Sequence, residues 1–573
     1  MEVNGSCDPR LRLEVRRLGP LPILNHFIGK LGLEAALDTA VPTTDRRCAL
    51  AHAKALGVLL RTLVVEREPI YRHQESVSAF ASSLFGVDDS EVTRLTDDSL
   101  GRALDRLFDA DRGAFVTKLV VALGKRFEVS FDQLHNDSTT IRLSGQYREA
   151  SGRSMRGRRA PWVTYGHSKD HRPDLKQLLF ILTTTKDGAL PVQFRCEDGN
   201  TNDVETHIET WETLRQVAGR PDFLYVADSK LCSRDNMAHI DHEHGRFVTV
   251  LPRSRSEDRA FRQWLQTNEP DWELVWDRPN PRRRYGPRDR WWVCKDPLPS
   301  AEVWPIIWVR SALLERHQEH SRRDRLARAK EELAEIKRRL AGPRSRLRKA
   351  SEIDERVALL LRRYKVGRYI KVERTTREVH SYKQRSPGRP GAATNYRRLT
   401  RRHFDLEWTL DEAAIAYDRK SDGMYPLLTN DKTLTPRQVL EAHKGQPAIE
   451  KRFEQCKTVH EIAPVFLKNE GRIEALFVLY FVGLLVQALI ERELRRRMRV
   501  EGIKELPIYP EERRSARPTT EQVFRLFSHV EGHVLRHDGA VGEVFQPALT
   551  DVQKEVLRLL GVPQSAYCIA AEA

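Results

Sequence analysis

The sequence is poor in cysteine. Its 573 residues include seven cysteines, which are scattered along the chain and never form a C-x-x-C pair. Neither a disulfide framework nor a zinc site of the usual spacing is therefore indicated, and a reducing compartment is expected.

Long hydrophobic segments are also lacking. The most apolar run, 475–490, is shorter than the ~20 residues of a membrane span and continues into a highly charged segment. We interpret it as a buried core helix and expect no membrane partner. The first residues carry an early acid, Glu2, and no apolar core, so no signal peptide is predicted.

Positive charge is in excess. Lysine and arginine number 97 against 81 aspartates and glutamates, which gives a net charge of +16. Such an excess favours an anionic partner, with nucleic acid first. The chain is also too long for one hydrophobic core, so we predict several domains.

Two predicted strands in the first half of the chain lead to an aspartate. Segment 127–131 alternates apolar and polar residues, as a half-buried strand does, and we expect Asp137 at its end. Segment 223–228 is apolar on both faces, which is typical of a central strand, and it stops at Asp228.

The elements between and after these strands follow a recognisable order. Segments 178–182 and 190–196 flank an Asp-Gly turn and predict a hairpin, and helices and a last strand at 246–252 complete the series. The order places Asp137 and Asp228 at the ends of strands that can lie side by side. It is the pattern of an α/β, ribonuclease H-like fold with a mixed five-stranded sheet flanked by helices.

A third acid stands on a predicted helix far along the chain. Pro447 suits the first turn of a helix, in which Ile449 and Phe453 then share one face. Glu450 and Lys457 lie seven residues apart, or two helical turns, so we expect them on one side. There they could present a carboxylate to a metal ion and an ammonium group to a phosphate.

With this third acid, the chain resembles the DDE transposases of bacterial insertion sequences. The similar branch has a Tyr-Arg-Glu-Lys signature and a long insertion between the second Asp and the Glu. The resemblance implies that Asp137, Asp228 and Glu450 form the catalytic triad and bind the metal. The spacing to Lys457 matches the signature, so this residue carries over as a DNA phosphate contact.

Four further residues are expected at the DNA. His443 stands where the family has Tyr, and Gln446 stands where it has Arg, so both carry over as positions of contact with the DNA ends. Lys169 and Arg172 belong to a polar loop near the first strand. For this loop, DNA contact and a plain solvated surface are both compatible with the residues.

The resemblance also implies cofactors and partners. Carboxylate oxygens select Mg²⁺ or Mn²⁺ over zinc, and two such ions would serve phosphodiester cleavage and strand transfer. The expected partners are double-stranded DNA, as terminal inverted repeats and as target, and a second copy of the chain in a homodimer. The expected location is the bacterial cytoplasm, with the nucleoid.

We predict five segments. They are a helical N-terminal region, 1–120, a first part of the catalytic core, 121–252, an insertion domain, 253–434, a second part of the core, 435–499, and a helical tail, 500–573. The first could be a helix-turn-helix DNA reader or a packing domain. In the insertion, Leu326, Leu333 and Leu340 form a heptad seam that could join two copies or close an internal helical hairpin.

Two other functions stay open. His443 and Gln446 depart from the signature and favour a domesticated or decayed copy that binds DNA without cutting it. A metal-dependent, structure-selective nuclease that never joins strands would use the same three acids.

Overall fold

The structure is a computed structural model that describes residues 11–45, 48–66, 70–143, 145, 147, 150–152, 154–169, 172–280, 286–342, 347, 349–459, 467, 469–538 and 540–569. It contains two compact units. The first unit combines residues 1–249 with 441–573, and the second comprises 250–440.

Five strands form the sheet of the first unit. In spatial order they are β6 (Pro191–Glu197), β5 (Lys176–Thr185), β2 (Gln133–Leu143), β7 (Leu224–Val226) and β8 (Arg246–Val250). β6, β5 and β2 are antiparallel, whereas β2, β7 and β8 are parallel. The predicted hairpin corresponds to β5 and β6, and the prediction of a mixed α/β architecture is confirmed.

The prediction of a first strand at 127–131 was wrong. Helix α7 (Arg112–Phe127) runs into this segment, and the backbone then turns at Glu128, which adopts a left-handed φ of 52°. The strand begins later, at Gln133, and is mostly polar. Asp137 therefore lies inside β2 and not at the end of the strand. The alternating apolar residues misled the prediction because one of them closes the helix and the others lie in the connection to β2.

A long apolar helix forms the core of the first unit. α16 (Glu470–Val500) contains the run interpreted as a core helix. Among the described helices it is the one long and apolar enough to cross a membrane, and 94% of its most apolar stretch is buried inside the structure. It packs against α3 (His52–Val65), α6 (Asp97–Asp109) and α18 (Asp551–Leu560). These buried contacts support its interpretation as a core helix.

The segments 1–120 and 500–573 were expected to be helical, but both also contain strands. β1 (Leu11–Arg17) pairs with β15 (Glu531–His537), which in turn pairs with β16 (Ala540–Phe545). The alternation of Leu11, Leu13 and Val15 in β1 is the signal that the helical interpretation missed. This sheet joins an N-terminal strand of the first unit to two strands from its C-terminal segment.

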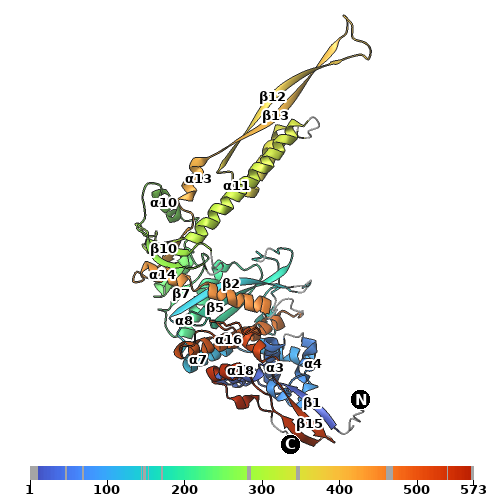
Figure 1. Cartoon of the computed structure of the whole chain (residues 1–573), viewed down its shortest axis with the longest axis vertical. Coiled ribbons are helices and arrows are strands. Elements are labelled where there is room, and N and C mark those ends of the chain that lie inside the picture. The colour runs from blue at the N-terminus through green and yellow to red at the C-terminus, as the bar shows by residue number, and fades with distance from the viewer. Residues whose placement is uncertain are drawn as a thin grey trace. The chain divides into compact units, whose positions relative to one another are not determined.

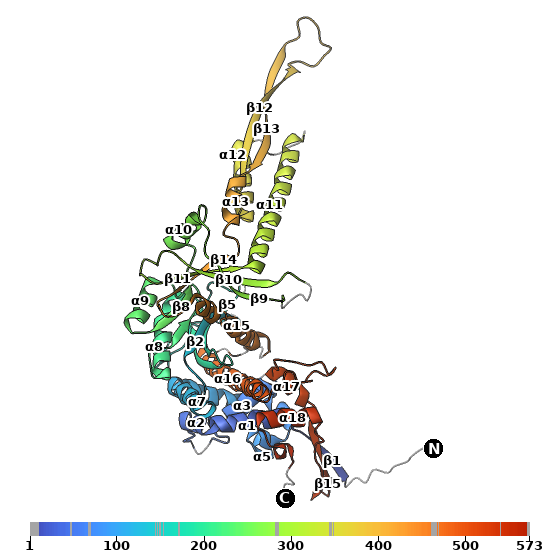
Figure 2. The ribbon, with the colours of Figure 1, turned by 60° about the vertical axis from the view of Figure 1, so that its left-hand side comes forward.

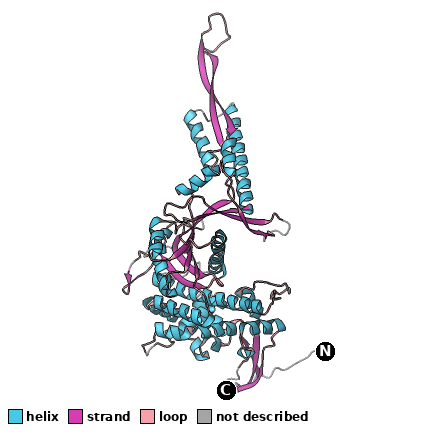
Figure 3. Cartoon of the chain, turned by 90° about the vertical axis from the view of Figure 1, so that its left-hand side faces the viewer, coloured by secondary structure: helices cyan, strands magenta, loops and turns pink. Residues whose placement is uncertain are grey.

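The remaining helices and strands of the first unit are short. They are α1 (Leu21–Leu31), α2 (Leu33–Ala40), α4 (His73–Ser78), α5 (Asp89–Val92), β3 (Ser154–Met155), β4 (Arg158–Arg159), α8 (His207–Ala218), α9 (Arg234–His242), α15 (Pro447–Glu454) and α17 (Thr520–Phe527). Figure 3 shows the strands of this unit as magenta arrows among cyan helices. α3 is buried over nearly its whole length, as a packing helix is.

The second unit combines an antiparallel sheet with several helices, of which α11 and α12 pack against each other. The sheet contains β14 (Met424–Thr429), β11 (Ile306–Ser311), β10 (Asp289–Lys295) and β9 (Glu273–Arg278). The helices are α10 (Ser256–Trp264), α11 (Ala312–Ala341), α12 (Ala350–Tyr364) and α13 (Glu412–Arg419), and α14 (Pro436–His443) leads back to the first unit. A long two-stranded ribbon, β12 (Ile370–Gln384) with β13 (Tyr396–Leu410), adjoins them (Figure 1).

The predicted leucine seam lies inside this second unit. Leu333 and Leu340 of α11 are buried in one cluster with α12 and the base of the ribbon, and Leu326 packs against the cluster. The internal helical hairpin, which was one of the two alternatives, thus accounts for the seam.

Candidate active site

Asp137 lies in β2, and Asp228 lies two residues past the end of the neighbouring strand β7. The parallel pairing of β2 with β7 ends where His135 lies opposite Val226. Asp137 is two residues beyond His135, and Asp228 is two residues beyond Val226. Asp137 is still within β2, whereas Asp228 lies in the loop that follows β7, and the negative charge of Asp228 acts on Asp137.

The helix that carries the third acid packs against this sheet. Asp137 lies opposite Leu182 of β5, and Phe180, two residues along β5, points to the same face. The ring of Phe180 meets that of Phe453 in α15 edge to face, with 6.5 Å between centroids. Glu450 lies one turn before Phe453. The helix that carries Glu450 therefore packs on the face of the sheet toward which Asp137 points.

The start of α15 is fixed directly on β2. The amide nitrogen of Gln446 donates a hydrogen bond to the carbonyl of Asn136 over 2.6 Å, and its oxygen lies 3.1 Å from Nδ1 of His135. Gly445 approaches so closely that a Cβ there would lie 2.4 Å from the His135 ring. Contacts with His135 and Asn136, the two residues that precede Asp137 in β2, thus position the helix.

Arg452 holds the other side of α15. Its buried guanidinium donates to the carbonyls of Gly188 and Ala189, over 3.0 Å each, and pairs with Glu491 of α16 at 3.0 Å. The sequence prediction did not include this residue. Because Arg452 faces the core, Glu450 two positions earlier is exposed.

The acids influence one another electrostatically. The pKa of Asp137 is raised to about 6, chiefly by burial and in addition by the negative charges of Asp228 and Glu450. The Lys169 ammonium and the Ser138 backbone N–H, which donates to Asp137 over 2.8 Å, act in the opposite direction. Asp137 thus lies within electrostatic range of the other two carboxylates.

The second aspartate has a similar environment. Burial raises the pKa of Asp228, and Asp203 adds to the effect, while the backbone N–H of Lys230 and the charge of Lys169 lower it. The N–H of Lys230 donates to the Asp228 carboxylate over 3.0 Å. Both aspartates are thus half-buried and each is fixed by one backbone N–H.

A fourth acid, Asp203, belongs to the same network. Lys169 forms an ion pair with Asp203 at 2.9 Å and donates to the Ser138 hydroxyl at 2.6 Å, and that hydroxyl donates to Asp203 at 2.9 Å. Their loops meet at two glycines, since a Cβ on Gly166 would lie 1.9 Å from the carbonyl oxygen of Gly199. The Gly-Asn-Thr-Asn-Asp segment at 199–203 was the signal that could have identified Asp203.

The expected DNA contacts occupy different environments. Lys169 lies at the acids, Arg172 is exposed and pairs with Asp174 at 2.7 Å, and His443 is half-buried. Burial, with the charges of Lys444 and His135, lowers the pKa of His443 to about 4. Gln446 is buried with both ends of its amide engaged inside the protein, so its position is one that orients α15.

Lys457 departs from the expected geometry. α15 ends at Glu454 and continues as a π-helical turn, Gln455–Val459, which contains Lys457. A π turn has more residues than an α turn, so two α-helical turns do not separate Glu450 from Lys457. The expected alignment of these two side chains is therefore not retained.

The carboxylates fit a divalent ion by donor type. Within the residues that the structure describes, no three His, Cys, Asp or Glu side chains are close enough to hold one metal ion. Carboxylate oxygens are nevertheless the ligands that Mg²⁺ and Mn²⁺ take. Burial and neighbouring acids disfavour the ionised form of Asp137, and a cation beside it would favour that form. The three carboxylates thus suit such an ion by donor type, and they would have to move closer together to hold one ion jointly.

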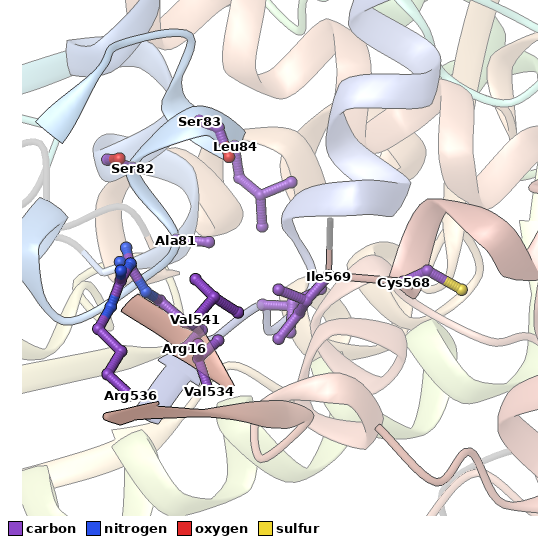
Figure 4. Close-up of a pocket in the computed structure, with 11 residues that line it drawn as sticks. Arg16, Ala81, Ser82, Ser83, Leu84, Val534, Arg536, Val541, Cys568 and Ile569 are labelled. Carbon is purple, nitrogen blue, oxygen red and sulfur yellow. The ribbon is translucent and has the colours of Figure 1, made fainter. Parts of the chain in front are cut away.

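A separate pocket lies away from these acids, in the first unit. It measures about 150 Å³ and is lined by Arg16, Arg536 and Cys568 together with apolar and hydroxyl side chains of the 81–84 and 534–541 segments (Figure 4). Arg16 and Arg536 both pair with Glu14. Its lining contains no carboxylate, so it offers no second acidic site.

Comparisons with known proteins give limited information. Residues 13–121 match the model of a family described as a domain of unknown function (DUF4277). No curated protein matches the chain. Among solved structures, the piggyBac transposase synaptic complex with hairpin DNA is similar at 12% identity and a TM-score of 0.24, over 51% of this chain and 59% of that chain. A likeness of this extent supports no conclusion about this chain.

Proposed function

We propose that the chain is a DDE-type transposase, which cuts DNA at the ends of its own element and joins those ends to target DNA. The observation that carries the proposal is the register of Asp137 and Asp228, with Glu450 coupled to Asp137. These acids are 91 and 222 residues apart in sequence (228 − 137 and 450 − 228), and the charges of Asp228 and Glu450 nevertheless both act on Asp137.

We assign the sheet of the first unit to a ribonuclease H-like arrangement. Its order, β6-β5-β2-β7-β8, with an antiparallel first half and a parallel second half, supports this assignment. The signature resemblance around Glu450 adds to it. Functions differ within one fold, so the carboxylates and not the sheet carry the proposed chemistry.

Asp137, Asp228 and Glu450 would hold Mg²⁺ or Mn²⁺. When bound, such ions activate an oxygen nucleophile and offset the charge that develops at the phosphoryl group. The chain's own groups orient and balance the site. Backbone N–H groups fix both aspartates, Lys169 offsets their repulsion, and the exposed position of Glu450 leaves its side of the helix accessible to DNA.

The test is strand cleavage by the purified protein on DNA that flanks its own gene, with Mg²⁺ or Mn²⁺. Asp228→Asn should abolish discrete nicks at the element ends. Asp132→Asn is the matched control, because Asp132 is exposed and pairs with Arg220 outside the site. We expect the control to cut as the unchanged protein does.

Other outcomes separate the alternatives. Binding of the ends without any metal-dependent cutting would favour the DNA-binding protein that lacks cleavage activity. Cutting of branched DNA irrespective of the ends, without joined products, would favour the structure-selective nuclease. Loss of cutting in both Asp132→Asn and Asp228→Asn would show that the assay reports folding and not the site.

A further inference from the structure

The ribbon of the second unit is long and largely without a core. β12 and β13 pair over fifteen residues each, from Ile370 opposite Leu410 to Gln384 opposite Tyr396, a length of about 50 Å. Its base is buried against α11 and α12 through Ile370, Phe404 and Leu406. Figure 2 shows the other half of the ribbon extending past the ends of these helices.

The outer half, residues 377–403, is termed the arm here. It contains eight lysines and arginines and one acid, Glu378. Arg402 pairs with Glu378 at 3.1 Å. Within the described part of the chain, no other ion pair involves the cations of the arm. A solvated surface is usually stabilised by interspersed charges of both signs, and the arm lacks that balance.

One face of the arm carries four of the six lysines and arginines in its two strands. Residues that lie opposite each other in the ribbon share a face, and the opposite pairs here are Arg377 with His403, Val379 with Arg401, and Lys383 with Arg397. This part of the face has four cations and no acid. Like charges placed directly opposite, as in Lys383 and Arg397, destabilise a ribbon. An anionic partner bound at this face would offset the repulsion between these cations.

The dimensions of the arm fit duplex DNA. A two-stranded ribbon can enter the major groove, which is about 12 Å wide. From Arg377 to Lys383 the cations extend over roughly 20 Å, which is about six base pairs of B-DNA. Arg385 and Arg389 add charge at the turn, which contains two prolines and two glycines. The opposite face presents Tyr382 and Tyr396, which are both exposed.

We propose that the arm is a second DNA-binding element, which lies in a groove of double-stranded DNA and contacts phosphates irrespective of base sequence. Its face of Arg377, Lys383, Arg397 and Arg401 makes the phosphate contacts. This role extends the proposed function and does not depend on whether the three acids cut DNA.

The experiment measures binding of the full chain to a fluorescently labelled 30-base-pair duplex of unrelated sequence, by anisotropy over a series of salt concentrations. The arm variant combines Arg377→Gln, Lys383→Gln, Arg397→Gln and Arg401→Gln. Each phosphate that is no longer neutralised lowers the dependence of log K on log salt by roughly 0.9, so four such phosphates lower the slope by about 3 to 4. We expect binding at least tenfold weaker near 0.15 M salt.

A matched control removes the same charge from the neighbouring helices. It combines Arg338→Gln, Arg339→Gln, Arg362→Gln and Arg363→Gln on α11 and α12. Circular dichroism melting of both variants confirms folding. Equal losses in the two variants would show a general charge effect and overturn the proposal, as would an unchanged salt slope in the arm variant.

Two further measurements separate this proposal from related ones. Asp228→Asn should bind the duplex as the unchanged protein does, so a failure of cleavage and a failure of the arm are distinguishable. Vesicles of anionic phospholipid and single-stranded RNA serve as competitors. If either displaces the chain through the arm while duplex DNA does not bind there, the partner is not DNA and the proposal is wrong.

Discussion

Asp137 and Asp228 each lie two positions past His135 and Val226, the last residues that pair between the parallel strands β2 and β7. This relationship explains why two acids that are 91 residues apart share an electrostatic environment. Substitutions at Asp137 and at the residues around the two acids should therefore have different, separately measurable effects.

Asp137→Asn should stabilise the metal-free protein at neutral pH. The pKa of Asp137 in the folded state is about 6 against an ordinary 3.8, so the folded state holds its proton more tightly than the unfolded chain. Stability from this group is therefore present at low pH and is lost as pH rises from about 4 to 6. The difference corresponds to a free energy on the order of 3 kcal/mol.

Urea unfolding in EDTA at pH 5 and at pH 7.5 measures this effect. The gain from Asp137→Asn should be larger at pH 7.5 than at pH 5. With Mg²⁺ added, the order should reverse, because only the carboxylate offers the ion a full negative charge. A variant that is less stable than the unchanged protein at both pH values without metal would contradict the prediction.

Lys169→Ala should shift the pH profile of cleavage. The ammonium lowers the pKa of Asp137 and of Asp228, so its removal raises both and moves the acidic limb of the profile to higher pH. Activity should therefore fall more at pH 6.5 than at pH 8.5, and Lys169→Arg should restore most of it. Lys118→Ala, an exposed cation on α7, is the control and should leave the profile in place.

Gln446→Arg tests whether this position contacts DNA or positions α15. The side chain is buried and joins Asn136 to His135. An arginine there would bury a charge without a partner, at a cost on the order of 3 kcal/mol. Denaturant unfolding should show this loss. Unchanged stability together with tighter binding of the DNA ends would instead assign position 446 to the DNA interface.

Gly445→Ala should displace α15 from β2. The added Cβ would lie 2.4 Å from the His135 ring, and overpacking of this kind costs about 1–3 kcal/mol. Because the helix carries Glu450, cleavage should fall more than stability does. Gly29→Ala is the control, since no atom lies within 4 Å of a Cβ at that glycine of α1. Equal activity of the two variants would count against the role of Gly445.

The order of the later strands could be predicted from the sequence because apolar segments and turn residues mark most of these elements, whereas the role of the three acids stays a prediction. β2 was misplaced because it is mostly polar, so hydrophobic periodicity does not reveal it. Some of its polar side chains bond to partners distant in sequence, as Asn136 does to Thr183 over 3.0 Å. Gln446 and Arg452 were likewise not recognisable as positioning residues, since their partners lie 310 and 264 residues away.

The pairing of β1 with β15 has a consequence for synthesis. Leu11 lies opposite His537, so its strand partner leaves the ribosome 526 residues later (537 − 11). At 5–20 residues per second this takes roughly 25–100 s. Glu450 likewise cannot join Asp137 and Asp228 before residue 450 has been synthesised. A nascent chain therefore carries β1 unpaired until residues 531–537 have been synthesised, and the complete first unit cannot form before then.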